Sequence, residues 1–136
     1  MRRLFLLILL ATVLSAYSKP PKKVTVARNS VASVLVYKNG ELLRNGLGVF
    51  VNATGELYSS YALFIDGDSA VTIDNRGTVR PVTKVLGADE TYDCMRLSVV
   101  GDKKLKGLEF SSRPAGNGNV LYLVSYGIKK SGSIEA

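Results

Sequence analysis

The 136-residue chain contains no histidine and no tryptophan, and it has one cysteine, Cys94. Without histidine there is no imidazole base, no His-dependent catalytic triad and almost no way to build a zinc site. A single cysteine cannot form an internal disulfide, so the fold must be held by its core. Asp93 precedes Cys94 and disfavours a thiolate there, so we expect Cys94 to be a small buried apolar residue.

Oxygen ligands for a metal are equally scarce. Asp66 and Asp68 in "IDGDS" are the best candidates for calcium. They lack a third oxygen ligand and a downstream glutamate at the spacing of a calcium loop. We interpret this stretch as a β-turn, and the sequence predicts neither a metal centre nor a cofactor.

The amino terminus has the pattern of a secretory signal peptide. Arg2 and Arg3 precede an apolar run from Leu4 to Leu14, and small residues follow before Lys19. This run is shorter than the roughly 20 residues that span a bilayer. We expect residues 1–18 to be a signal peptide cleaved after Ser18, with an uncleaved anchor as the alternative. The mature protein would then be periplasmic or extracellular, without a membrane span.

The formal net charge of +7 is concentrated near the amino terminus. Arg2 and Arg3 belong to the signal peptide, and the basic, proline-containing segment 19–30 ("KPPKKVTVARNS") carries most of the remaining excess. The rest of the chain is close to neutral, and Lys103, Lys104 and Lys106 fit a solvated loop. We therefore expect no nucleic-acid partner. The latter half of segment 19–30 is expected to form one or two helical turns.

Beyond residue 30 the pattern changes to short β-strands. "VASVLVY" ends at Asn39-Gly40, a pair typical of tight hairpins. Further strands are expected in "GLGVFV", "ELYSSYALFI", "AVTI", "TVRPVTKVL", "CMRLSVV", "LEFSS" and "NVLYLVSY", and one beginning near Ser133. Alternation of apolar and polar residues places Met95, Leu97 and Val99 on one face of their strand. In the strand "TVRPVTKVL", Val79, Thr83 and Val85 are expected on one face, and Pro81 marks an edge or a bulge. This spacing predicts an all-β barrel or sandwich.

The order of motifs resembles the first half of a trypsin-like serine protease, most of all the bacterial HtrA-like branch. The motifs are "GLGVFV", "ATGELYSSYALF", "GDSAVTI", "RGTVRPVTKVLGAD" and "DCMRLSVV", followed by "LEFSSRPAGNGNVLYLVSYG". The resemblance implies an antiparallel six-stranded first barrel over residues 31–115. It also implies the opening strand or strands of an incomplete second barrel over residues 116–136.

Carried over residue by residue, the resemblance leaves a degenerate catalytic site. The family histidine falls on Ala62 and the family aspartate on Asp93, while the catalytic serine of the second barrel falls beyond Ala136. Asp93 alone has no imidazole to orient. Ser59, Ser60, Ser125 and Ser131, and Lys84 or Lys103 as a base, are expected to be solvated residues of strands and turns, because a serine needs an adjacent base.

Three hypotheses on function follow. The first is a pseudo-protease acting as a binding or structural module, or as the amino-terminal part of a longer protein. The second is a serine-type peptidase whose serine lies in sequence not shown, and the third is a non-functional fragment. A protein or peptide partner on an exposed barrel face is expected, and a dimer is an alternative. Tyrosines suited to such a contact, or to packing on the barrel, are Tyr37, Tyr58, Tyr61, Tyr92, Tyr122 and Tyr126.

Overall fold

The computed structural model describes residues 20–125, 127–128 and 134–135. The signal peptide expected over residues 1–18 lies outside this range. The described chain begins with helix α2 (Lys22–Ala27), which continues into the 3-10 turn η1 (Arg28–Ser30), as expected of segment 19–30. Among the described residues, no helix has the length and apolarity needed to cross a membrane.

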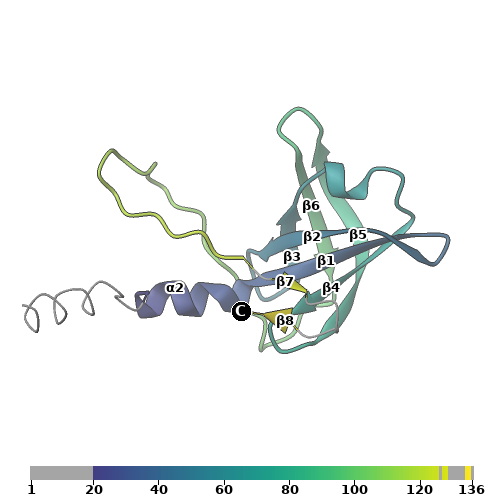
Figure 1. Ribbon diagram of the computed structural model, residues 1–136, viewed down its shortest axis with the longest axis horizontal. Helices are drawn as coiled ribbons and strands as arrows, with labels where there is room; N and C mark the ends of the chain where they lie inside the picture. Colours follow the sequence, from purple (N-terminus) through teal and green to yellow (C-terminus); the bar gives the residue numbers. More distant parts are fainter. Residues whose placement is uncertain (1–19, 126, 129–133, 136) are drawn as a thin grey trace, which may run out of the picture.

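Strands β1 to β6 form a closed antiparallel barrel with the order β1-β2-β3-β6-β5-β4 (Figure 1). The strands are β1 (Val31–Lys38), β2 (Glu41–Phe50), β3 (Glu56–Ser59), β4 (Ser69–Asp74), β5 (Val79–Asp89) and β6 (Cys94–Val99). The expected all-β architecture and six-stranded barrel are thereby confirmed. At the β1–β2 turn, Asn39 and Gly40 have φ of 51° and 81°, the positive values that the tight hairpin requires.

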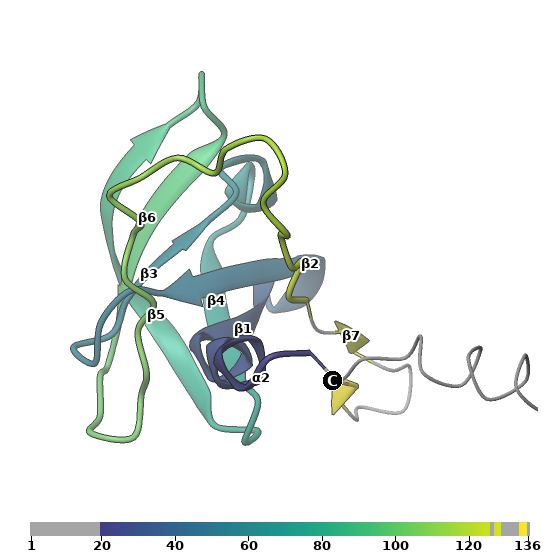
Figure 2. The same cartoon turned by 90° about the vertical axis from the view of Figure 1, so that its left-hand side faces the viewer.

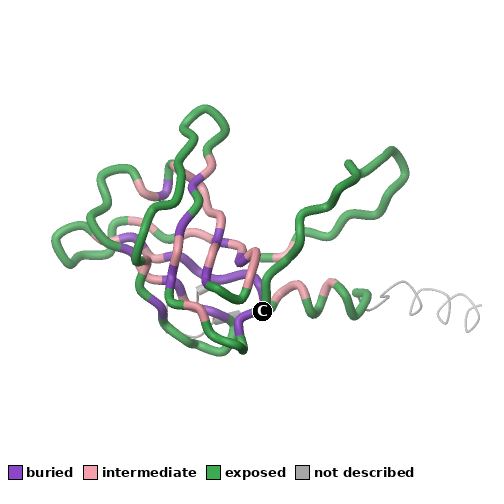
Figure 3. Tube along the Cα trace, turned by 180° about the vertical axis from the view of Figure 1, so that it is seen from behind, coloured by how far each residue is buried: buried purple, intermediate pink, exposed green. Residues whose placement is uncertain are grey.

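The core lies inside this barrel and is built by alternation along the strands. Met95, Leu97 and Val99 of β6 point inward as predicted and are at most 7% exposed. Phe50 and Leu57 join them, and both are fully buried. Figure 3 shows the buried positions gathered in the barrel wall, whereas the hairpin tips and most of the segment after β6 are exposed, with Leu105 as a buried exception.

Strand β5 is irregular after Pro81. Its pairing with β6 shifts between Val82 and Lys84 and again between Val85 and Gly87. Val79, Thr83 and Val85 are all exposed, whereas Arg80, which lies before both shifts, points inward with 5% exposure. Cys94 is half-buried rather than buried, because it begins β6 and pairs with Asp89 next to the turn of the β5–β6 hairpin.

The two strands expected in "LEFSS" and "NVLYLVSY" are wrong for the described residues. Residues 108–125 form instead an extended arm without strand pairing, which leaves the barrel on the same side as α2 (Figures 1 and 2). At its base, Leu108 donates a backbone hydrogen bond to Phe50 (2.8 Å), and Phe110 packs edge-on against Tyr58 with ring centroids 5.3 Å apart. Two short strands, β7 (Gly127–Ile128) and β8 (Ile134–Glu135), pair with each other.

Candidate functional site

The two positions of the candidate site meet because β3 and β6 are neighbours in the barrel. Ser59 of β3 pairs with Met95 of β6, so the residues just beyond each strand end lie at the same end of the barrel. On one side is the 3-10 turn η2 (Ala62–Phe64), and on the other is Asp93 in the turn before β6. The predicted strand "ELYSSYALFI" therefore ends at Ser59, and η2 takes over its second half.

The carboxylate of Asp93 is held by the segment that leads into η2. Its Oδ1 accepts a hydrogen bond from the backbone N–H of Ala62 at 2.7 Å. The Ser60 hydroxyl also donates to this carboxylate, with Oγ 2.7 Å from Oδ2. The Ala62 N–H, followed by the Ser60 hydroxyl, lowers the pKa of Asp93 below its ordinary value. Asp93 thus works as a cap for the start of η2.

The backbone at Asp93 is bent to make this contact. Its φ is 48°, in the left-handed region that Asp tolerates better than most residues. The bend turns the carboxylate toward the start of η2, although Asp93 itself remains exposed. The hydrogen bond that joins Ala62 to Asp93 comes from the main chain of residue 62 and needs no side chain there.

The side chains at this site are those of Ala62, Asp93, Ser60 and Ser59. The methyl group of Ala62 can neither accept nor donate a proton. The lowered pKa of Asp93 makes its carboxylate a weaker base toward the Ser60 hydroxyl, which donates a hydrogen bond to it. Ser59 is occupied elsewhere, because its Oγ donates to the carbonyl oxygen of Leu47 at 2.8 Å.

The remaining candidate residues do not join this site in any contact of the described chain. Lys84 and Lys103 are exposed, on β5 and in the turn after β6 respectively. Ser125 is exposed at the end of the arm, and Ser131 lies outside the described residues. The lysines at 103, 104 and 106 are all exposed, as expected of a solvated loop.

The loop containing Asp66 and Asp68 is a turn, as predicted. Asp66 has a φ of 63°, and Asp68 accepts hydrogen bonds from the Asn39 backbone N–H (2.6 Å) and the Ser69 hydroxyl (2.8 Å). These two bonds, that of Asn39 first, lower the pKa of Asp68. Within the described ranges, no cluster of three or more His, Cys, Asp or Glu side chains is arranged to hold a metal ion.

Sequence reasoning missed one cluster of charges inside the barrel wall. Arg80 donates to Asp74 (2.9 Å) and also bonds the Asp102 carboxylate, and it is almost fully buried. Arg76 adds a further contact to Asp74, at 2.9 Å. Pro81 marked an irregular strand, but nothing in the local pattern indicated that the neighbouring arginine would turn inward.

Comparison with known proteins yields a match at the level of structure only. No protein-family model matches the sequence, and a search of curated proteins found no match. Among solved structures, the chain is similar to the serine endoprotease from Yersinia pestis, with a TM-score of 0.63 at 14% sequence identity. The match covers 87% of this chain and 43% of that chain, so this chain spans less than half of that protein's length. At this identity the likeness shows the fold alone: the closed barrel of β1 to β6 is a trypsin-like barrel.

Proposed function

We propose that this protein is an exported, catalytically inactive homologue of trypsin-like serine proteases. It acts as a binding or structural module, by itself or as the amino-terminal part of a longer protein in which residues 116–136 begin a second barrel. The observation that carries the proposal is the bond from the Ala62 N–H to Asp93. The one acidic residue retained at the site is used to cap η2, and position 62 carries no base.

The size of the expected loss supports inactivity. In serine proteases, removal of one triad member lowers turnover by roughly four to six orders of magnitude. The catalytic activity that remains in such variants comes from substrate binding and from groups that stabilise the oxyanion. In support of inactivity, the Ser60 hydroxyl donates a hydrogen bond to the Asp93 carboxylate, whose pKa is lowered, and Ala62 carries no base.

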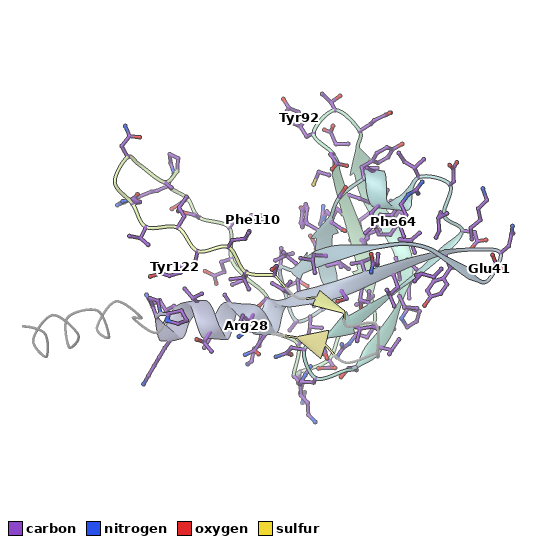
Figure 4. All side chains as sticks on the ribbon, viewed as in Figure 1. Arg28, Glu41, Phe64, Tyr92, Phe110 and Tyr122 are labelled. Carbon is purple, nitrogen blue, oxygen red and sulfur yellow. The ribbon has the colours of Figure 1, made fainter. Side chains whose placement is uncertain are left out.

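The exposed arm supports a role in binding. Phe110, Val120, Leu121 and Leu123 are between 73% and 95% exposed, an unusual concentration of apolar surface. Tyr122 lies on the same arm, and Tyr92 is 81% exposed at the tip of the β5–β6 hairpin (Figure 4). Tyr37, Tyr58 and Tyr61 are half-buried, and Tyr126 lies outside the described residues. We propose that the arm contacts a protein or peptide partner, or a further part of the same chain.

A serine-type peptidase is the second candidate, favoured by the placement of Asp93. The carboxylate points at residue 62, where a protease of this fold would need its base. In this alternative, both the serine and an unusual base would be supplied by sequence beyond Ala136.

One experiment separates these functions. The native protein is recovered from the envelope and secreted fractions of its source, its intact mass is measured, and it is treated with a fluorophosphonate probe and with casein. We expect no labelling and no cleavage. The same protein carrying Ala62→His is the matched comparison: activity that arises in this variant and is absent from the wild type supports inactivity caused by position 62. Labelling and cleavage by the wild type would overturn the proposal.

A further inference from the structure

In the closed barrel, β4 and β5 pair over only part of their length, which leaves an opening between the start of β4 and the middle of β5. These strands pair only from Val71–Pro81 to Ile73–Val79. Pro81 has no N–H to continue the ladder, and two shifts in the pairing of β5 with β6 follow it along the strand. Ser69 and Ala70 still pair with β1, but they have no partner on β5. The opening therefore begins where the β4–β5 pairing ends, at Pro81.

A cavity of about 310 Å³ occupies this opening. Its lining includes Val36, Met95 and Leu97, which belong to the barrel core and are at most 7% exposed. Phe64 of η2, labelled in Figure 4, and Val82 of β5 add apolar surface. A pocket that reaches the core through an apolar wall is typical of sites for small apolar molecules.

The polar groups of the lining differ in what they offer a ligand. The carboxylate of Asp68 already accepts hydrogen bonds from the Asn39 N–H and the Ser69 hydroxyl. Lys84 also lines the cavity, is exposed, and takes part in none of the ion pairs of the described residues. The opening thus combines an apolar interior with a lysine ammonium that is open to an anion.

We propose that this cavity binds a small amphipathic carboxylate, with the apolar chain against Leu97 and Met95 and the carboxylate at Lys84. The volume of the cavity limits the length of the ligand's apolar chain. At about 30 Å³ for each group of the size of a water molecule, 310 Å³ accommodates roughly ten such groups. The carboxylate would stay at the solvent edge, because burying a charge without a partner is costly. The site is distinct from the position of Ala62 and Asp93 and does not depend on the proposed function.

Octanoate is a suitable probe for this site. Full-chain protein, labelled with ¹⁵N, is titrated with octanoate, with acetate and with octylammonium. We expect octanoate to produce saturable shifts at the amides of Ser69, Ala70 and Lys84, and acetate to produce none. Octylammonium should bind at least about fivefold more weakly, as expected for one charge pair near the surface. Octanoate shifts that do not saturate, or that lie away from the cavity, would overturn the proposal.

Charge reversal tests the role assigned to the lysine. Lys84→Glu should weaken the binding of octanoate about fivefold to tenfold and make octylammonium the preferred ligand. Lys103→Glu is the control and should leave the affinity for both ligands unchanged. Ala70→Leu should fill the cavity and abolish binding of both ligands. Lys84 is exposed, so its variant tests the proposal even if Ala70→Leu fails to fold. Equal binding of octanoate by Lys84→Glu and Lys103→Glu would refute the site.

Discussion

Arg80 and Asp74 form an ion pair inside the barrel wall: Nη1 lies 2.9 Å from Oδ2, and the two side chains are 5% and 3% exposed. The second guanidinium nitrogen of Arg80 bonds Asp102, in the turn after β6. The cluster therefore ties the β4–β5 hairpin to the turn that leads into the arm. A buried pair of this kind is not a strong source of stability in itself, but the loss of one partner leaves a buried charge uncompensated.

Removal of the Arg80 side chain should therefore destabilise the protein strongly. We expect Arg80→Met to lower the free energy of unfolding by about 3 kcal/mol, because the buried carboxylate of Asp74 then keeps only the ion pair with Arg76, whose side chain is 39% exposed. Urea denaturation measures the change. Arg96→Met is the matched control, since Arg96 pairs with Glu56 but is 47% exposed. The control should have a much smaller effect. Equal effects of the two variants would contradict the role of the buried pair.

Acid should destabilise the protein through Asp74. Burial raises the pKa of Asp74, but hydrogen bonds from Arg80, Thr78 and Arg76 outweigh it and lower the pKa from 3.8 to about 2. Since the folded-state pKa is depressed, the contribution is present above about pH 4 and is lost as the pH falls from about 4 to about 2. It amounts to about 2 kcal/mol.

The comparison that isolates this contribution is between the wild type and Asp74→Asn. Urea midpoints are measured at intervals from about pH 6 to about pH 2. The difference in stability between the two proteins should shrink by about 2 kcal/mol over the window from about pH 4 to about pH 2. A difference that stays constant across this window would show that Asp74 has an ordinary pKa in the folded protein.

The cap at η2 predicts a structural role for Asp93. Asp93→Ala removes the acceptor for the Ala62 N–H and the Ser60 hydroxyl, so we expect the melting temperature to fall by a few degrees. Asp93→Asn retains one acceptor oxygen, so its melting temperature should fall less than that of Asp93→Ala. Glu90→Ala, in the same exposed turn, is the control. Circular dichroism on heating measures all three, and no loss with Asp93→Ala would contradict the capping role.

Local patterns predict the barrel well and its irregularities poorly. Met95 and Leu97 follow simple alternation, and Asn39-Gly40 form the expected turn, because both depend on nearby residues only. Arg80 points inward, where its charge is matched by Asp74 of the paired strand and by Asp102 after β6, and neither partner can be identified from the residues next to Arg80. The arm has the composition of a strand, yet a strand needs a partner for its hydrogen bonds, and sequence alone does not show where that partner is.

Gly55 should be among the least replaceable glycines. Its φ is 95°, and a Cβ atom there would lie 2.2 Å from the carbonyl oxygen of Val99. We expect Gly55→Ala to lower the free energy of unfolding by about 3 kcal/mol or more, because both the backbone conformation and a main-chain contact resist it. Gly87→Ala is the control, since nothing lies within 4 Å of the added atom. It should change stability by no more than about 0.5 kcal/mol.

The arm should govern association of the protein. Leu123 is 95% exposed, and the sequence has no charged residue between Arg113 and Lys129. Uncharged apolar segments with free backbone groups pair readily with other chains, and a lysine placed in them opposes such pairing. We expect Leu123→Lys to reduce self-association measured by sedimentation velocity at increasing concentration, with an unchanged melting temperature.

Val79→Lys is the matched control for this prediction. It adds the same charge at another exposed apolar position, on β5 of the barrel, where Val79 is 57% exposed. If the arm is the contact surface, Val79→Lys should associate like the wild type, and only Leu123→Lys should become more monomeric. An equal reduction by both variants would mean that net charge, and not the arm, controls association.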